Sequence, residues 1–190
     1  MKNIAIFASG SGTNFEHLAL ACENGKIPAK IALLVCDNAN AFVLQRAKNH
    51  NVPVFLFNVK NFESRKYYET EILNKLTEYH IDIICLAGYM RIVGETLLVA
   101  FPQKILNIHP ALLPAFKGAH AIDDAFNFGV KVFGVTVHLI DNTIDGGTII
   151  AQRAFEYNGN NRDEVEHKIH EIEHELFSEA VNLVINDTKK

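Results

Sequence analysis

The segment Asn107-Ile108-His109-Pro110 combines two side chains that could catalyse the transfer of an acyl group. It lies at the end of an apolar run that predicts a strand over 104–108, and ligands of open α/β sheets bind beyond the carboxyl ends of such strands. Side chains alternate along a strand, so Asn107 and His109 point to the same side. An amide that donates to an oxyanion, beside an imidazole that moves protons, is typical of acyl transfer. A histidine before proline is also common in ordinary loops, so both interpretations stay open.

A carboxylate that could assist His109 lies in the segment Asp145-Gly146-Gly147, between two runs rich in β-branched residues. At a strand end, Asp145 could orient the imidazole of His109 and stabilise its charged form. The same three residues are also typical of a simple turn. The sequence lacks a Gly-x-Ser-x-Gly nucleophile motif, which favours direct transfer over a covalent intermediate.

The segment Ser9-Gly10-Ser11-Gly12-Thr13-Asn14 follows the first predicted strand and precedes the first predicted helix. Backbone N–H groups and the helix dipole make such a loop an anion site, so we expect it to hold a phosphate. Phe15 stands where the dinucleotide fingerprint requires a third glycine, which argues against a pyrophosphate clamp. Asp37, at the end of the second strand, could contact a ribose and keeps dinucleotide binding open. A tight glycine-rich turn without a ligand is the remaining alternative.

The segment His170-Glu171-Ile172-Glu173-His174 matches the His-Glu-x-x-His motif of zinc proteases on a predicted helix. The two histidines are four residues apart and share a helix face. No further Gly and His follow in the pattern of the longer zinc motifs, although Glu175 or Glu179 could supply a third ligand. The alternative is a charged face of an amphipathic helix, and we expect no metal.

Composition restricts the class of protein. The chain has 190 residues, 48% of them hydrophobic, with 18 Lys and Arg against 22 Asp and Glu. This apolar content excludes global disorder, and a net charge of −4 gives no positive field for a long nucleic acid. Cys22, Cys36 and Cys85 form no Cys-x-x-Cys pair, which favours a reducing cytoplasm. No stretch reaches the roughly 18 apolar residues of a membrane span.

Short apolar runs alternate with longer amphipathic segments, which predicts an α/β chain with a mostly parallel sheet covered by crossover helices. We expect strands over 3–8, 31–36, 54–57, 81–87, 104–108, 132–140 and 148–155. We expect helices from Phe15, over 42–48, from Ser64 to about His80, over 121–128, and from Asp163 to about Ile185. The helix after Ser64 would bury Tyr67, Ile72, Leu73 and Leu76.

In this order, the motifs resemble those of the folate-dependent phosphoribosylglycinamide formyltransferases of purine biosynthesis. The resemblance rests on the segment 9–14, Ala87-Gly88-Tyr89-Met90-Arg91-Ile92, 107–114, Gly134-Val135-Thr136-Val137-His138, Asp145-Gly146-Gly147 and Glu173-His174. It implies a Rossmann-like formyltransferase fold with a mostly parallel, twisted sheet of about seven strands flanked by helices. It also implies a single domain over 1–190. Its N-terminal half would bind the phosphate and ribonucleotide, its C-terminal half would bind folate, and a cleft would lie between them.

The resemblance further implies transfer of the formyl group of 10-formyltetrahydrofolate, as co-substrate, to the primary amine of 5-phosphoribosylglycinamide, without a metal. By motif match, the catalytic residues would be Asn107, His109 and Asp145. Those for the ribonucleotide and its phosphate would be Gly12, Thr13, Asn14, Gly88, Pro110 and Glu173. Those for folate would be Arg65, Met90, Arg91, Ile92, Val93 and Asn107.

The chain departs from this family pattern at Ile122, where some relatives have a second histidine, and in a short C-terminus. Methionyl-tRNA formyltransferases and formyltetrahydrofolate hydrolases look similar around Asn-x-His-Pro, but each carries an additional domain for which 190 residues leave no room. We expect two small-molecule substrates, no nucleic-acid or membrane partner and a cytoplasmic location, with a weak homodimer left open.

Overall fold

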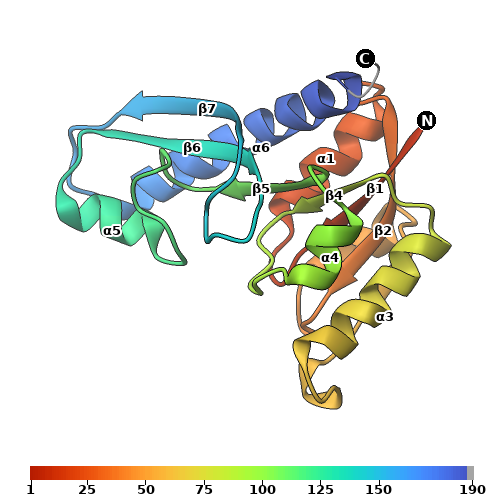
Figure 1. Cartoon of the computed structure of the whole chain (residues 1–190). Coiled ribbons are helices and arrows are strands. Elements are labelled where there is room, and N and C mark those ends of the chain that lie inside the picture. The colour runs from red at the N-terminus through yellow and green to blue at the C-terminus, as the bar shows by residue number, and fades with distance from the viewer. Residues whose placement is uncertain (188–190) are drawn as a thin grey trace.

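A computed structural model describes residues 1–187 as one seven-stranded sheet flanked by helices (Figure 1). The strand order is β3-β2-β1-β4-β5-β6-β7. The strands are β1 (Lys2–Phe7), β2 (Ala29–Cys36), β3 (Val54–Leu56), β4 (Ile83–Leu86), β5 (Ile105–His109), β6 (Val132–Leu139) and β7 (Ile149–Glu156). Strands β1 to β5 pair in parallel, whereas β5–β6 and β6–β7 pair antiparallel. The predicted α/β class and its mostly parallel sheet are confirmed.

Helices cover both faces of this sheet. They are α1 (Thr13–Glu23), α2 (Val43–Asn49), α3 (Arg65–Glu78), α4 (Glu95–Ala100), α5 (Ala121–Phe128) and α6 (Arg162–Asp187), with a short 3-10 turn η1 (Val59–Asn61). Helices α3 and α4 pack on one face, and α1, α2, α5 and α6 contribute to the core on the other. The long α6 runs from the β6–β7 end of the molecule to α1 (Figure 1). Within the described chain, no helix combines the length and apolar character needed to cross a bilayer.

The second part of β1, from Ile4 to Phe7, is continuously apolar because both of its faces are buried. Ile4 and Ile6 pack in the core beneath α1 and α6, whereas Ala5 and Phe7 pack beneath α3 and α4. Alternate side chains point to opposite faces, and here both faces are buried. The loop over residues 9–14 leaves the carboxyl end of β1, next to the ends of its parallel neighbours β2 and β4.

On the sheet face that α3 covers, one prediction was wrong and one helix was missed. Tyr67 is 57% exposed, and its neighbour Tyr68 is buried in its place. One residue rotates a helix by about 100°, so an error of one position moves a side chain off the buried face. Helix α4 was also missed, because six residues are too few to show a helical periodicity.

The antiparallel pairing of β5 and β6 determines how the second half of the site is built. Leu139, at the end of β6, pairs with Leu106 near the start of β5, and Thr136 pairs with His109. The chain therefore leaves β6 beside the start of β5, at the opposite end of that strand from His109. The acidic loop, which we define as residues 140–148, must double back to bring Asp145 there.

Candidate active site

Asn107 lies on β5 directly opposite His138 of β6, and the two side chains are hydrogen-bonded. The Nδ1–H of His138 donates to the carbonyl of Gly146 at 2.7 Å. Its Nε2 therefore carries the lone pair and accepts from Nδ2 of Asn107 at 3.1 Å. Burial lowers the pKa of His138, which keeps this ring neutral. The result is an Asn107 amide held in one orientation, with a second N–H left to donate.

His109, at the end of β5, is 4% exposed and faces acceptors at both ring nitrogens. Its Nε2–H donates to the carbonyl of Phe116 at 2.8 Å. Its Nδ1 lies 3.6 Å from Oδ2 of Asp145, which is an ion-pair distance but too long for a hydrogen bond. The Nδ1 edge can therefore turn to a substrate while the nearby carboxylate stabilises a positive charge on the ring.

Asp145 is held in place by the backbone around it. Its Oδ2 accepts the N–H of Gly118 at 2.6 Å, and its φ of +46° lies in the left-handed region. Two residues on, Gly147 has φ +87°, and a Cβ there would lie 2.0 Å from the carbonyl oxygen of Leu139. Glycine is therefore required for the acidic loop to fold back. The structure thus brings Asn107, His109 and Asp145 together, as the sequence predicts.

The glycine loop, residues 9–14, crosses from β1 to the start of α1. Gly12 is the N-cap of α1 with φ +74°, and a Cβ there would lie 2.4 Å from Cγ2 of Val43. No side chain caps this helix end. Phe15 is completely buried in the core, so the position of the third dinucleotide glycine is used for packing. The free N–H groups at the helix start can donate hydrogen bonds to a phosphate.

Asn14 and Glu173 connect this loop to α6. Nδ2 of Asn14 donates to Oε2 of Glu173 at 3.1 Å, and both side chains are buried. Oδ1 of Asn14 and Nε2 of His174 are buried without a hydrogen-bond partner in the described chain. Buried polar atoms of this kind indicate a place where a ligand or water binds. The predicted residues Gly12, Thr13, Asn14 and Glu173 thus lie together where the start of α1 meets α6.

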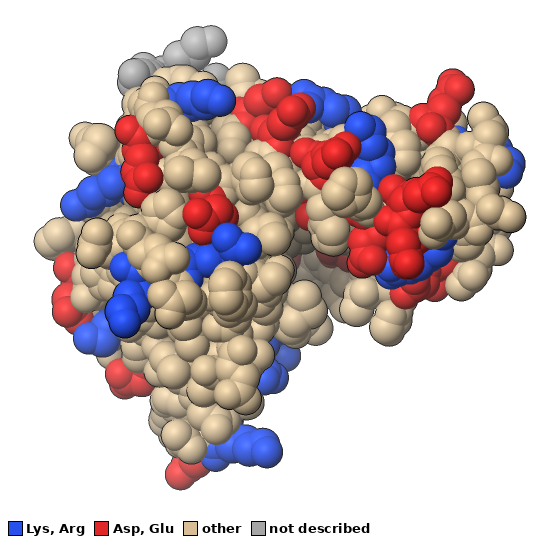
Figure 2. Space-filling view, turned by 180° about the vertical axis from the view of Figure 1, so that it is seen from behind, with Lys and Arg blue, Asp and Glu red and all other residues tan. Residues whose placement is uncertain are grey.

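The zinc-like motif on α6 has other partners. His174 stacks on His17 of α1 with 3.6 Å between ring centroids, and His170 is hydrogen-bonded to Glu173 at 3.0 Å. Within residues 1–187, no three His, Cys, Asp or Glu side chains gather to hold a metal ion. Figure 2 shows acidic and basic side chains mixed on the face opposite to that of Figure 1. On α6, Lys168 pairs with Glu171 at 2.8 Å. His170 and Glu171 thus lie on an exposed, charged face of α6, whereas Glu173 and His174 contact α1.

The segment after β4 joins the glycine loop. The Ser9 N–H donates to the carbonyl of Gly88 at 3.1 Å, and the Met90 N–H donates to Oγ of Ser9. Nε of Arg91 lies 2.6 Å from Oδ2 of Asp37, whose other oxygen accepts the Ser9 hydroxyl. Asp37 is thereby occupied, which removes the main support for dinucleotide binding.

The remaining predicted folate residues lie at the surface or beside a groove. Met90 is 74% and Ile92 58% exposed, whereas Val93 is buried. Arg65, at the start of α3, lines a cavity of about 710 Å³ with Lys66, Glu69, Gly94, Glu95, Thr96 and Val99. This cavity excludes Asn107, His109 and Asp145. Pro110 follows His109 directly and is half-buried.

Sequence reasoning missed the groups that hold the catalytic side chains. His138 orients Asn107, the carbonyl of Phe116 accepts from His109, and Gly118 anchors Asp145. Only His138 has a recognisable signal, a polar residue within a strand. Its role depends on the register of β5 against β6, which no local pattern determines.

A protein-family model described as formyl transferase matches residues 2–181. The chain belongs to the formyl transferase family. Among its relatives, the phosphoribosylglycinamide formyltransferase of Bacillus subtilis (strain 168) is 43% identical over 186 residues, covering 97% of this chain and 95% of that protein. The enzyme of the same name from Haemophilus influenzae is 38% identical, covering 93% of this chain and 84% of that one.

Solved structures of the formyl transferase family agree with this fold. A glycinamide ribonucleotide transformylase from Geobacillus kaustophilus is 48% identical with a TM-score of 0.94, and the match covers 97% of this chain and 98% of that one. A phosphoribosylglycinamide formyltransferase from Bacillus halodurans is 44% identical, also with a TM-score of 0.94, and covers 97% and 95%. Such full-length agreement supports comparison of the whole site.

Proposed function

We propose that this formyl transferase moves the formyl group of 10-formyltetrahydrofolate to the primary amine of 5-phosphoribosylglycinamide, a step of purine biosynthesis. The observation that carries the proposal is the Asn107, His109 and Asp145 cluster, with His138 fixing the amide. Relatives bearing this enzyme's name match nearly the whole chain. An oriented amide donor beside an imidazole suits attack on a formyl carbon.

In this mechanism, the uncharged amine attacks the formyl carbon, which forms a C–N bond and a tetrahedral oxyanion. The free N–H of Asn107 and the Nδ1–H of protonated His109 donate to that oxyanion, and the Asp145 carboxylate balances the imidazolium charge. The bond from the carbon to the folate nitrogen then breaks. The proton lost by the attacking nitrogen reaches the departing nitrogen, so atoms and charges balance without a metal.

We place the ribonucleotide phosphate at Gly12, Thr13 and Asn14. The left-handed N-cap and the uncapped start of α1 support this placement. Gly88 and Pro110 would then border the ribonucleotide between the two sites, and Glu173 would contact its amine side. The unpartnered Oδ1 of Asn14 supports a ligand at this position.

We place folate against Met90, Arg91, Ile92 and Val93, with Asn107 at its formyl group and Arg65 at its far end. The exposed apolar side chains of Met90 and Ile92 support contact with a flat ring system. Phosphate and folate would share one cleft in a single domain, where the Met90 segment is joined to the glycine loop through Ser9. Arg65 and Met90 to Val93 lie before the midpoint of the chain, so folate would not be confined to the C-terminal half. A cytoplasmic enzyme agrees with three free cysteines, two of them buried.

A two-substrate assay tests the function. The absorbance of the folate should change only when 10-formyltetrahydrofolate and 5-phosphoribosylglycinamide are both present. NAD should not protect the protein against unfolding, and a chelator should leave the rate unchanged. Loss of activity with a chelator and recovery with zinc would contradict the proposal.

A further inference from the structure

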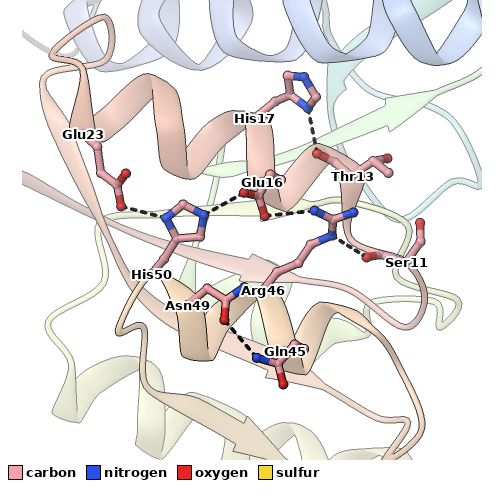
Figure 3. A network of polar contacts seen from close by, with 9 residues as sticks. All are labelled: Ser11, Thr13, Glu16, His17, Glu23, Gln45, Arg46, Asn49 and His50. Atoms are coloured by element: carbon pink, nitrogen blue, oxygen red, sulfur yellow. Dashed lines mark hydrogen bonds and ion pairs between the residues drawn. The ribbon is translucent and has the colours of Figure 1, made fainter.

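A polar network on α1 and α2 ends at the glycine loop (Figure 3). Nε of Arg46 donates to the carbonyl of Ser11 at 2.9 Å, and its Nη1 donates to Oε2 of Glu16 at 3.0 Å. Oε1 of Glu16 lies 3.0 Å from Nε2 of His50, and Nδ1 of His50 lies 2.7 Å from Oε1 of Glu23. The contacts form an unbroken chain from the last turn of α1 to the loop.

Helix α2 holds the loop at two further points. The N–H of Val43 donates to the carbonyl of Gly10 at 3.1 Å, and the Val43 side chain fills the space in which a Cβ of Gly12 would lie. Together with Arg46, these contacts turn two loop carbonyls toward α2. Carbonyls that point to α2 cannot point at an incoming anion, so the N–H groups of the loop are left to face it.

Charge gives the network a second role. Glu16 lies in the first turn of α1, where its carboxylate would repel a phosphate at the same helix end. Arg46 and a protonated His50 neutralise it at hydrogen-bond distance. Burial disfavours the charged form of His50, but hydrogen bonds to Glu23 and Glu16 outweigh it and raise its pKa. Burial raises the pKa of Glu16, but hydrogen bonds from His50 and Arg46 outweigh burial and lower it.

The surroundings of His50 leave these two carboxylates as its ionic partners in the described chain. Its ring packs edge-on against Phe15 of α1 at 6.1 Å between centroids. On its other side, a cavity of about 290 Å³ is lined by His50, Met1, Cys22, Glu23 and, from β2, Lys30. The side chain of His50 is only 10% exposed, so its charge is weakly screened.

We propose that Arg46 and His50 are positioning residues for phosphate binding, Arg46 by fixing the Ser11 backbone and His50 by holding Glu16 against Arg46. Neither residue touches the substrate. The inference rests on the proposed phosphate site at the glycine loop. It adds that α2, outside every motif of the sequence, determines how well that loop binds an anion.

Ribose 5-phosphate tests this without formyl transfer, by calorimetric titration of the full chain. Arg46→Met should weaken binding roughly tenfold, because a charged hydrogen bond to the loop is lost. Arg46→Lys keeps the charge but cannot bridge Ser11 and Glu16, so its loss should be smaller. In the two-substrate assay, Arg46→Met should raise KM for the ribonucleotide and leave kcat and KM for folate unchanged.

The pH profile isolates His50. At low pH, His50→Gln should bind ribose 5-phosphate about threefold more weakly than the original chain, and the two affinities should converge as pH rises and His50 loses its proton. Protonation of the phosphate affects both proteins equally, so it cancels in the ratio of the two affinities. Arg153→Met and His167→Gln are matched controls, since these residues pair with glutamates elsewhere.

Failure of the inference differs from failure of the proposed function. If the original chain transfers the formyl group but does not bind ribose 5-phosphate, the inference is wrong and the proposed function stands; if it does neither, both are wrong. If it binds, and Arg46→Met lowers the unfolding temperature but not the affinity, Arg46 is merely structural and the inference alone is wrong. A ratio for His50→Gln that does not change with pH would also overturn the role given to its charge.

Discussion

The β5–β6 centre and the glycine loop are built in opposite ways. In the centre, buried side chains hold one another: His138 orients Asn107, and Asp145 faces His109. In the glycine loop, backbone N–H groups would bind the phosphate that we propose, and α2 holds the loop from outside. Substitutions in the two regions should therefore change different kinetic constants. Damage to the centre should lower kcat, and damage to the loop should raise KM for the ribonucleotide.

Two histidines show the same contrast in charge. His138 lies in the centre with its pKa lowered by burial and works as a neutral acceptor. His50 lies behind the loop, where hydrogen bonds to Glu23 and Glu16 overcome burial and raise its pKa. Burial alone does not determine the charge of a histidine. Hydrogen bonds to carboxylates, which His50 has and His138 lacks, can outweigh it.

The largest expected effect is that of His109→Ala. Loss of the imidazole removes one of the two proposed donors to the oxyanion, so kcat should fall by about 10²–10⁴-fold. KM for the ribonucleotide should stay within about twofold, and circular dichroism should show an intact fold, because His109 is the last residue of β5 and its ring is hydrogen-bonded only to a loop carbonyl in the described chain. Near-normal turnover would remove His109 from the mechanism.

Asp145→Asn should lower kcat by roughly 10²-fold, because the amide keeps the shape but not the charge that balances the imidazolium. Asparagine tolerates the left-handed φ at this position and can still accept from Gly118. Asp141→Asn, in the same acidic loop, is the matched control. Equal effects of the two variants in steady-state assays would count against a role for Asp145 at His109.

Gly12→Val should act on binding. The new Cβ would clash with Val43 and strain a φ of +74°, so KM for the ribonucleotide should rise about tenfold or more. KM for folate should not change. Gly129→Ala imposes a similar left-handed strain at the end of α5, in open space, and controls for lost stability. A rise in KM for folate instead would mean that the two substrate sites are exchanged.

Glu173→Gln should have a smaller effect, confined to the amine substrate. Glutamine still accepts from Asn14 but loses the negative charge, so KM for the ribonucleotide should rise about threefold to tenfold. His170→Ala, three residues away on α6, should leave turnover largely intact, because its ring is half-exposed and its ion pairs in the described chain are with carboxylates of its own helix. Loss of turnover in His170→Ala would reopen the zinc interpretation.

The smallest effects concern stability and have opposite signs with pH. His50 stabilises the fold fully below its ordinary pKa near 6.5, and this contribution, at most about 1 kcal/mol, is lost as pH rises through the raised value. Protonation of His138 destabilises the fold. Its contribution to the free energy of unfolding is therefore full above pH 6.5 and is lost as the pH falls through its lowered pKa. Urea unfolding of His50→Gln and His138→Gln across pH 5–9 would measure both. Parallel pH trends for the two variants would contradict the assigned charges.

The sequence contains enough to predict the sheet and the three central residues. Alternation along β5 places Asn107 and His109 together, and glycines mark both loops. It does not contain the register of β5 against β6, which pairs Asn107 with His138 and requires the acidic loop to fold back. It also gives no sign of the contact from Arg46 to Ser11, because a link between segments 35 residues apart depends on tertiary packing.

Transfer of a heavy-carbon label tests the central claim most directly. The label starts on the formyl group of 10-formyltetrahydrofolate, and mass spectrometry follows it into the ribonucleotide for the original chain, His109→Ala and Gly12→Val. The account predicts labelled formyl-glycinamide ribonucleotide from the original chain. It also predicts slow transfer by His109→Ala at every ribonucleotide concentration, and recovery of Gly12→Val when the ribonucleotide is raised. Recovery of His109→Ala at high ribonucleotide, or an unlabelled product from the original chain, would contradict it.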